Sequence, residues 1–347
     1  MTSLKEKLIA EITADGPMRL DTYMTRCLLD SEQGYYATRD PFGEGGDFIT
    51  APEISQMFGE MVGLCLTQVW MDQGRPDLSL VELGPGRGTL MADMLRVMGK
   101  MGLTPPVHLV EASTTLRDIQ RHRIGKAVWH DDVTTLPDGP MLIVANEFFD
   151  ALPIRQFVRG KTGWSERRIG VKDGKMAWGL TGEAAEEGLT ARLSDTKPGD
   201  LVEICPAAAP IMEEITSRIS NHGGAALIID YGGWRSLGDT FQALADHAPM
   251  DPLDDPGNAD LTAHVDFEAL AQAAQGKVSD MVPQGFWLER LGITARAEVL
   301  AAGLKDSELK SHVAAHRRLT HPAEMGSLFK VISVTPMAAP PVPGFDS

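Results

Sequence analysis

Residues 81–90 read VELGPGRGTL, with glycine at 84, 86 and 88 directly after a short apolar run that contains one acid, Glu82. An apolar strand, a glycine-rich turn and a helix form the first unit of nucleotide-binding α/β folds, whose ligand lies beyond the carboxyl ends of the strands. Glycine has no Cβ, so a turn rich in glycine can bring its backbone close to a ligand. The stretch therefore predicts a ligand held against the backbone of this turn.

Three kinds of ligand compete for the turn. A phosphate-binding P-loop ends in Gly-Lys-Ser/Thr, but Thr89 and Leu90 follow Gly88 here, and a dinucleotide fingerprint, GxGxxG, would need glycine at 89. The remaining pattern, GxGxG preceded by an acid, is the one expected for S-adenosylmethionine. This cofactor has a positive amino group and a positive sulfonium and no pyrophosphate, so the carboxylate of Glu82 would attract it. The candidate cofactor residues of this segment are Glu82, Gly84, Pro85, Gly86 and Gly88.

Two further acids follow the next two predicted strands. Glu111 ends the strand 107–111, about as far from the glycine turn as the acid that binds the ribose hydroxyls in nucleotide folds. A carboxylate and two hydroxyls form a charge-assisted bidentate pair. Asp131 follows the strand 127–130 and could accept a hydrogen bond from the adenine amino group. An acid that caps a helix or a turn is an equal interpretation of Asp131.

The pattern around the turn predicts a Rossmann-like α/β fold. Apolar strands are expected at 78–83, 107–111, 127–130, 141–145, 225–231 and 328–334, with helices at 90–101, 114–122 and 210–220. Nearly continuous apolar strands separated by helices are typical of a parallel sheet covered on both faces. The expected regions are an N-terminal helical and lid region (1–76), the first half of the core (77–153), a small antiparallel β-rich insertion (154–205), the second half with C-terminal helices (206–335), and a proline-rich disordered tail (336–347).

The methyl acceptor is expected where the strand 141–145 ends, at the sequence NEFFDALP. Asn146, Glu147 and Asp150 would orient a cationic or amino nucleophile, and aromatic rings tolerate a sulfonium charge. Alternatively, the two acids cap the following turn and the two phenylalanines belong to the core. His264, between Asp260 and Asp266, is a candidate base or a structural histidine. The segment 46–55, GDFITAPEIS, is a candidate lid.

Composition narrows the class of protein. The 347 residues carry a formal net charge of −16, from 48 acidic and 32 basic residues, which disfavours nucleic acid and favours a cationic ligand or a basic peptide. No apolar stretch approaches the length of a membrane span, and the N-terminus lacks the features of a secretory signal. Three scattered cysteines predict isolated thiols and no metal site. The expected compartment is the bacterial cytoplasm, or the mitochondrial matrix only if a presequence is missing.

Six segments together resemble the MidA-type S-adenosylmethionine-dependent methyltransferases over about residues 16–331. They are GDFITAPEIS, VELGPGRGTLMADMLR, NEFFDALP, IIDYG, DLTAHVDF and MGSLFKV, in this order along the chain. The resemblance implies that the glycine turn, Glu82 and Glu111 bind the methyl donor and that residues 146–150 face the acceptor. This family includes a mitochondrial assembly methyltransferase of respiratory complex I.

That resemblance implies a protein arginine N-methyltransferase, whose acceptor would be a basic segment of a complex I core subunit or a related protein. Two alternatives are a methyltransferase for a small molecule or another side chain, and an assembly chaperone that binds the cofactor without catalysis. The sequence allows a homodimer but does not require one.

Overall fold

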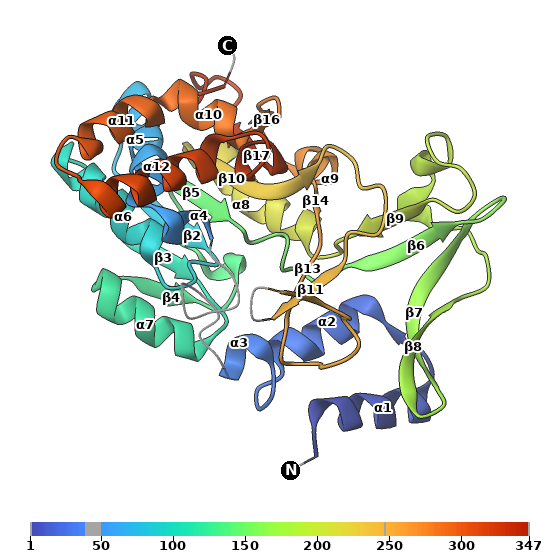
Figure 1. Cartoon of the computed structure of the whole chain (residues 1–347). Coiled ribbons are helices and arrows are strands. Elements are labelled where there is room, and N and C mark those ends of the chain that lie inside the picture. Colours follow the sequence, from blue (N-terminus) through green and yellow to red (C-terminus); the bar gives the residue numbers. More distant parts are fainter. Residues whose placement is uncertain (1, 39–49, 246–247, 346–347) are drawn as a thin grey trace.

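The structure, a computed structural model, describes residues 2–38, 50–245 and 248–345 (Figure 1). Its main sheet has the strand order β15-β17-β10-β5-β2-β3-β4, with β14 beside β10 and β16 beside β17. Neighbouring strands from β10 to β4 are parallel, and β17 is antiparallel to β10. The alternation of strands and helices confirms the predicted Rossmann-like α/β class. The strands are β2 (Ser79–Leu83), β3 (Val107–Val110), β4 (Val128–His130), β5 (Met141–Asn146), β10 (Gly224–Gly233), β14 (Val265–Asp266), β15 (Lys277–Val278), β16 (Val282–Pro283) and β17 (Phe329–Thr335).

Helices bury both faces of this sheet. Alternate strand residues point to opposite faces, so Leu80 and Leu142 join one apolar core while Val81 and Ile143 join the other. Residues of α5, α6, α10 and α11 pack in the first core, and residues of α8 and α9 pack in the second. The helices of the core are α5 (Gln56–Asp72), α6 (Thr89–Lys100), α7 (Thr114–Ile124), α8 (Ala208–His222), α9 (Phe267–Ala273), α10 (Gln284–Leu291), α11 (Ile293–Ala301), α12 (Asp306–Thr320) and α13 (Met325–Leu328).

The predicted insertion forms an antiparallel sheet beside the core, at the right of Figure 1. Its strands are β6 (Arg155–Arg159), β7 (Trp164–Lys172), β8 (Lys175–Leu180) and β9 (Leu201–Ile204). The N-terminal strand β1 (Met18–Arg19) pairs with β7, and α1 (Leu4–Asp15) and α2 (Leu20–Leu29) contact the same strand. The region 1–76 therefore divides: its first helices pack on the insertion, whereas α5 packs on α6 in the main core.

Two parts of the C-terminal half differ from the expectation. A small antiparallel sheet, in the order β12-β11-β13, stands where helices were expected. Its strands are β11 (Gln242–Ala245), β12 (Ala248–Met250) and β13 (Asp260–Thr262), and their short sequences, QALA, APM and DLT, carry little strand signal. The tail from 336 to 345 is packed rather than disordered: Val342 is 3% exposed, and the carbonyl of Pro343 accepts a hydrogen bond from Trp287 Nε1 at 3.2 Å. Its stability comes from this tertiary contact.

Glycines let α5 and α6 approach each other closely. A Cβ added at Gly63 would lie 2.6 Å from Val97 Cγ1 and 3.0 Å from the backbone of Met94. On the same helix, the buried Glu60 binds Arg96 at 2.6 Å and, from α11, Arg296 at 2.6 Å. Burial acts to raise the pKa of Glu60, but the hydrogen bonds from the two arginines hold it below its ordinary value. This face of the core thus combines close apolar packing with an ion-paired acid.

Within the described residues, no helix combines the length and the apolar composition needed to cross a bilayer. Across the same residues, no group of three or more histidine, cysteine, aspartate or glutamate side chains is arranged to hold a metal ion.

The contact between α5 and α6 predicts opposite effects for two glycine-to-alanine substitutions. Gly63→Ala should lower the free energy of unfolding by about 1–3 kcal/mol, because its Cβ overlaps Val97 and the backbone of Met94. Gly99→Ala, on the open side of α6 with no atom within 4 Å of its Cβ, should raise that free energy by up to about 1 kcal/mol through helix propensity. Urea unfolding measures both, and equal effects would contradict the proposed packing.

Candidate active site

The glycine turn lies between β2 and α6 and uses three left-handed residues. Gly84, Gly86 and Gly88 have φ values of 61°, 50° and 76°, a region that residues with a Cβ rarely adopt. A Cβ on Gly84 would lie 2.9 Å from Phe148, and one on Gly88 would lie 2.7 Å from Ile124. The sequence indicated that glycine here leaves room for a ligand. At 84 and 88, contacts with neighbouring side chains of the protein also require glycine.

A cavity of about 300 Å³ opens beyond the carboxyl ends of β2, β3 and β5. Gly84, Gly86, Glu111, Asp131 and Glu147 are among the residues that line it. A smaller hollow of about 40 Å³ shares Gly84, Gly86 and Glu147 with the cavity, and its lining also includes Glu82, Pro85 and Asn146. The predicted donor residues thus line one or both of these adjoining spaces, apart from Gly88, which caps α6 and packs against Ile124.

Two buried acceptors face the small hollow. Among the described residues, neither Glu82 Oε2 nor Asn146 Oδ1 has a hydrogen-bond partner. Burial, together with the charge of Glu111, raises the pKa of Glu82 to about 8. A buried acceptor without a partner costs free energy, and an ammonium group in the hollow could donate to both oxygens. The hollow therefore fits the cationic amino acid part of S-adenosylmethionine.

Glu111 is held at the far side of the larger cavity. Its Oε1 accepts from Ser113 N at 2.8 Å, and its Oε2 accepts from Gln120 Nε2 at 3.1 Å. Gln120 Nε2 also donates to the Gly86 carbonyl at 2.7 Å, so it joins the turn to the acid from within the fold. Burial raises the pKa of Glu111. Each of these oxygens keeps lone-pair capacity toward the cavity that Glu111 lines, where ribose hydroxyls could donate.

Asp131 and Asp132 have different positions after β4. The side chain of Asp131 is 87% exposed and pairs with Arg117 at 2.5 Å on the rim of the cavity. Asp132 caps the short helix η1 (Val133–Thr135) by accepting from Thr134 N at 2.8 Å. Asp132 is therefore the capping acid, and Asp131 lies at the mouth of the cavity.

A second cavity of about 270 Å³ adjoins the first. Tyr36, Glu147 and Ala151 line both cavities, and Glu147 also lines the hollow under the glycine turn. The three spaces thus meet at Glu147. The second cavity gathers polar and aromatic side chains from distant segments, which are Tyr36, Asp150, Tyr231, Asp260, Thr262 and His264.

Of the two acids of NEFFDALP, Asp150 is buried and Glu147 is half-buried, and they are close enough to influence each other. Glu147 has a left-handed φ of 52°, and its Oε1 accepts from Ala51 N at 3.1 Å and Asn146 Nδ2 at 3.2 Å. Burial raises the pKa of Glu147 to about 8, and the charge of Asp150 adds to this shift. Burial also raises the pKa of Asp150, although a hydrogen bond with Tyr231 opposes the rise. Within the described part of the chain, Asp150 Oδ1 has no hydrogen-bond partner.

Asp230 positions this turn, and sequence reasoning assigned it no role. Its Oδ2 accepts from the backbone N–H groups of Phe148, Phe149 and Asp150 at 3.2, 3.0 and 3.3 Å. Successive N–H groups that converge on one anion form a concave nest. Asp230 is fully buried, and burial raises its pKa, as does the nearby Asp150. The available signal was its position as the one acid in the apolar strand AALIIDY.

Tyr36 also received no role from the sequence, and Asp260 was expected only as a carboxylate partner of His264. The Tyr36 hydroxyl donates to Asp260 Oδ1 at 2.8 Å across a separation of 224 residues. Asp266 accepts from Ala269 N at 3.0 Å and caps α9. His264 lines the second cavity, and partial desolvation of its ring together with the charge of Lys330 lowers its pKa. The two acids that flank His264 in the sequence thus have structural hydrogen bonds of their own.

The candidate lid lies partly outside the described residues, since residues 46–49 are not among them. The described part begins at Thr50, and α4 (Ala51–Ile54) follows it directly. Thr50 and Pro52 line the hollow beside the glycine turn, and Ala51 N donates to Glu147. This end of the segment therefore contacts the site.

Replacing Glu82 should have opposite effects on stability and on cofactor binding. Its folded pKa, about 8, exceeds the ordinary carboxyl value of 4.5. The native state then binds more protons than the unfolded state between these values, so stability falls as pH rises through the interval. Glu82→Gln should remove this loss and make the ligand-free protein more stable than the unchanged protein at pH 8, with a smaller difference at pH 5.

The same substitution should weaken S-adenosylmethionine binding about 10- to 100-fold, because a charged hydrogen bond is lost. Thermal unfolding at the two pH values and isothermal titration measure the two effects. Glu213→Gln, on the exposed face of α8, is the matched control and should change neither. Unchanged affinity in Glu82→Gln would exclude the proposed ammonium contact.

Known proteins with similar sequences identify the family. Residues 61–286 match the family described as "Putative S-adenosyl-L-methionine-dependent methyltransferase". The chain is 38% identical over 390 residues to "Protein arginine methyltransferase NDUFAF7, mitochondrial" of Xenopus tropicalis, with 99% of this chain and 89% of the relative covered. The Homo sapiens protein of the same name is 36% identical, with 97% of this chain and 84% of the relative covered.

A solved structure supports the same assignment. The crystal structure of a protein from Burkholderia thailandensis bound to S-adenosyl-homocysteine has a TM-score of 0.84 and 29% sequence identity, and the match covers 99% of this chain and 92% of that chain. S-adenosyl-homocysteine is the form of the cofactor that remains after the methyl group has left. Together with the sequence matches, it confirms the resemblance to the MidA-type enzymes. The chain therefore belongs to this family of S-adenosyl-L-methionine-dependent methyltransferases, and its cofactor is S-adenosylmethionine.

Proposed function

We propose that this methyltransferase modifies an arginine side chain of a protein, and that the guanidinium enters the cavity beside Asp150. The observation that carries the proposal is the unpartnered Asp150 Oδ1 in an acidic, aromatic cavity that meets the donor cavity at Glu147. Asp260 and two tyrosines line the same cavity. Carboxylates pair well with the planar guanidinium, and aromatic faces attract it. The names of the relatives, which are protein arginine methyltransferases, support the choice of arginine over other cations.

Bound S-adenosylmethionine supplies a methyl group on a positively charged sulfur. As the acceptor nitrogen forms its bond to this methyl group, the sulfur–methyl bond breaks, and the nitrogen loses a proton. Alignment of the two groups is a large part of such catalysis. Asp150 would orient the guanidinium, and Glu147, at the junction of the cavities, would accept the proton. A carboxylate with a pKa near 8 is a stronger base than an ordinary glutamate.

The resemblance to the family points to a basic segment of a respiratory complex I core subunit as the acceptor. The formal net charge of −16 complements a basic segment. The relatives are mitochondrial by name; a bacterial cytoplasm for this chain and a homodimer remain predictions. Acceptors of another class are outcomes of the test below.

Transfer of a labelled methyl group tests the acceptor. Methyl-labelled S-adenosylmethionine and the protein are incubated with an extract of cells that lack it, and mass spectrometry should find label on arginine in a protein. Label only in small molecules would support a small-molecule methyltransferase. Label only on other side chains would equally contradict arginine.

Two conservative variants separate chemistry from cofactor binding. Glu147→Gln and Asp150→Asn should each lower transfer about 100-fold or more, with the affinity for S-adenosylmethionine changed less than threefold, about 0.7 kcal/mol. Asp280→Asn, at an exposed position, is the control and should retain full transfer. Full transfer by both site variants, or restored assembly of the partner in cells with either of them, would favour a chaperone that binds the cofactor without catalysis.

The proposed base also predicts a pH profile. Glu147 must be ionised to accept a proton, so kcat/KM for the acceptor should fall as pH drops below its raised pKa of about 8. The slope should approach about tenfold per pH unit well below that value. Initial rates from pH 6 to 9 at saturating S-adenosylmethionine measure the profile. A rate independent of pH over this range would assign the proton to another acceptor.

A further inference from the structure

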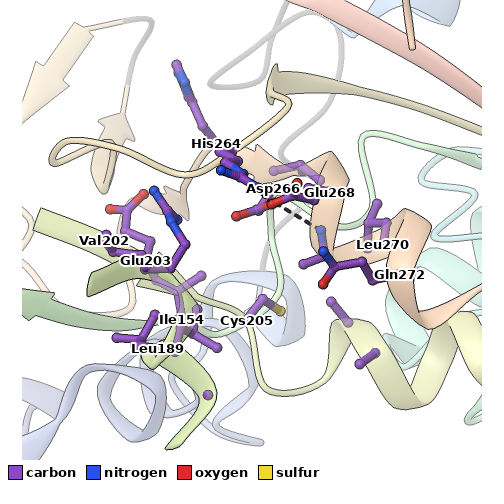
Figure 2. Close-up of a pocket in the computed structure, with 18 of the residues that line it drawn as sticks. Ile154, Leu189, Val202, Glu203, Cys205, His264, Asp266, Glu268, Leu270 and Gln272 are labelled. Atoms are coloured by element: carbon purple, nitrogen blue, oxygen red, sulfur yellow. Dashed lines mark hydrogen bonds and ion pairs between the residues drawn. The ribbon is translucent and has the colours of Figure 1, made fainter. Parts of the chain in front are cut away.

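A third cavity, of about 430 Å³, lies between the β-rich insertion and α9. In Figure 2 the side chains of Leu189, Val202 and Glu203 from the insertion lie opposite Asp266, Leu270 and Gln272, and Cys205 lies between the two groups. None of the candidate donor residues lines this cavity. The insertion forms one side of this cavity. The insertion is an addition to the Rossmann-like core, which consists of the main sheet, its helices and the glycine turn.

This cavity adjoins the acceptor cavity, because the two linings share a residue. His264 lines both of them. Phe149 lines the third cavity and its neighbour Asp150 lines the acceptor cavity, so consecutive residues of one turn face the two spaces. The adjoining Ala263 N donates to the Asp150 carbonyl at 3.0 Å. A group bound in the third cavity would therefore lie next to the proposed guanidinium site.

The lining of the third cavity favours an apolar group. Its floor includes Phe149, Ile154, Leu189, Val202 and Leu270. Burial raises the pKa of the Cys205 thiol to about 11, so at neutral pH this side chain is a small, uncharged surface. Unpartnered buried acceptors of the kind found at Glu82 and Asp150 do not occur among the described residues of this lining.

Charged residues at the rim are already paired. Arg235 binds Glu268 and also binds Asp195 at 3.2 Å. Arg192 binds Asp195 at 3.1 Å and donates to the Ser236 carbonyl at 2.9 Å. These arginines are therefore not poised to bind an acidic ligand.

The neighbouring edge strand does not offer its backbone to a peptide strand. β9 forms the edge of the insertion sheet. Gly238 N donates to the Leu201 carbonyl at 2.8 Å, and Glu203 N donates to Ser236 Oγ at 2.9 Å. Because these groups are satisfied within the protein, strand addition is disfavoured. The edge of β9 therefore does not favour an added strand beside the cavity.

We propose that the third cavity binds an apolar side chain of the acceptor protein, within a few residues of the methylated arginine. This inference rests on the proposed function, because it assumes that the adjoining cavity receives the arginine of a protein segment. It also explains a function of the insertion. Because β9 forms one wall of the third cavity, the enzyme would prefer acceptor sequences with an apolar residue near the arginine. Free arginine would occupy only the acceptor cavity and would make no contact in the third cavity.

Short synthetic peptides with one central arginine test the proposal. One peptide has alanine at every flanking position, and the others place a single leucine at each flanking position in turn. Leucine at one or two positions should lower KM about 10-fold or more, which corresponds to burial of one leucine side chain, with kcat nearly unchanged. The measurement uses the full chain and saturating S-adenosylmethionine.

Tryptophan at two exposed alanines on different helices should fill the cavity. Ala209 near the start of α8 and Ala269 on α9 both line it, and both are exposed, so the larger side chain need not enter the core. Ala209→Trp and Ala269→Trp should each abolish the leucine preference while cofactor affinity and kcat on the all-alanine peptide stay within twofold. Ala314→Trp, at an exposed alanine of α12, should keep the preference.

The outcomes separate this inference from the function on which it rests. Methylation of the peptides with the same KM for every leucine position, or a preference that survives both tryptophan variants, would overturn the third cavity as a subsite and leave arginine methylation intact. Absence of methyl transfer to arginine in any peptide and in the cell extract would overturn the proposed function, and the subsite with it.

Discussion

The hydrogen bonds between Asp230 and the backbone after β5 are the constraint on which the active site depends. One carboxylate oxygen accepts from the N–H groups of Phe148, Phe149 and Asp150, and so holds the chain where it leaves the sheet. The left-handed conformation of Glu147 lies at the start of this nest. A backbone turned in this way directs Glu147 to the junction of the donor and acceptor cavities, and directs Asp150 into the acceptor cavity.

The site carries a concentration of buried acids that a stable core would avoid. Glu82, Asp150 and Asp230 are buried and Glu147 is half-buried, and removal from water raises the pKa of each. Two of their oxygens, Glu82 Oε2 and Asp150 Oδ1, lack partners among the described residues. Cations are the natural complement of such a site, because they supply both the charge and the missing hydrogen-bond donors. The methyl donor and the proposed guanidinium acceptor are both cations, so one electrostatic feature explains selection of both.

The parts of the fold were predictable to different degrees. The main strands and their order along the chain followed from apolar runs, and the insertion from alternating segments with turn signals. The small sheet of β11 to β13 did not follow, because strands such as QALA carry no alternation that separates them from helix or loop. The packed tail was equally hidden, since its order comes from Trp287 and the α5 region rather than from its own sequence.

Within the site, the residues found by sequence were those tied to a local pattern. Glu82 lies on β2 just before the glycine turn, and Glu111, Glu147 and Asp150 follow strand ends. The role of Asp230 could not be predicted from the sequence, because Asp230 accepts hydrogen bonds from a backbone segment that lies more than 80 residues earlier. The role of Tyr36 was not predicted because its hydrogen-bond partner, Asp260, lies 224 residues away in the sequence.

The sequence by itself determined the strand–turn–helix that we propose binds the cofactor, the acids at the strand ends and the apolar faces of the sheet. These properties depend on neighbours a few residues apart, where periodicity and glycine act directly. The tertiary structure alone decided that Tyr36, Glu147, Asp150 and Asp260 share one cavity, and that the insertion forms a wall of the next. These distant residues lie close together because the connections of a parallel sheet bring strand ends that are far apart in the sequence to one edge. A local sequence pattern does not show which side chains will face each other there.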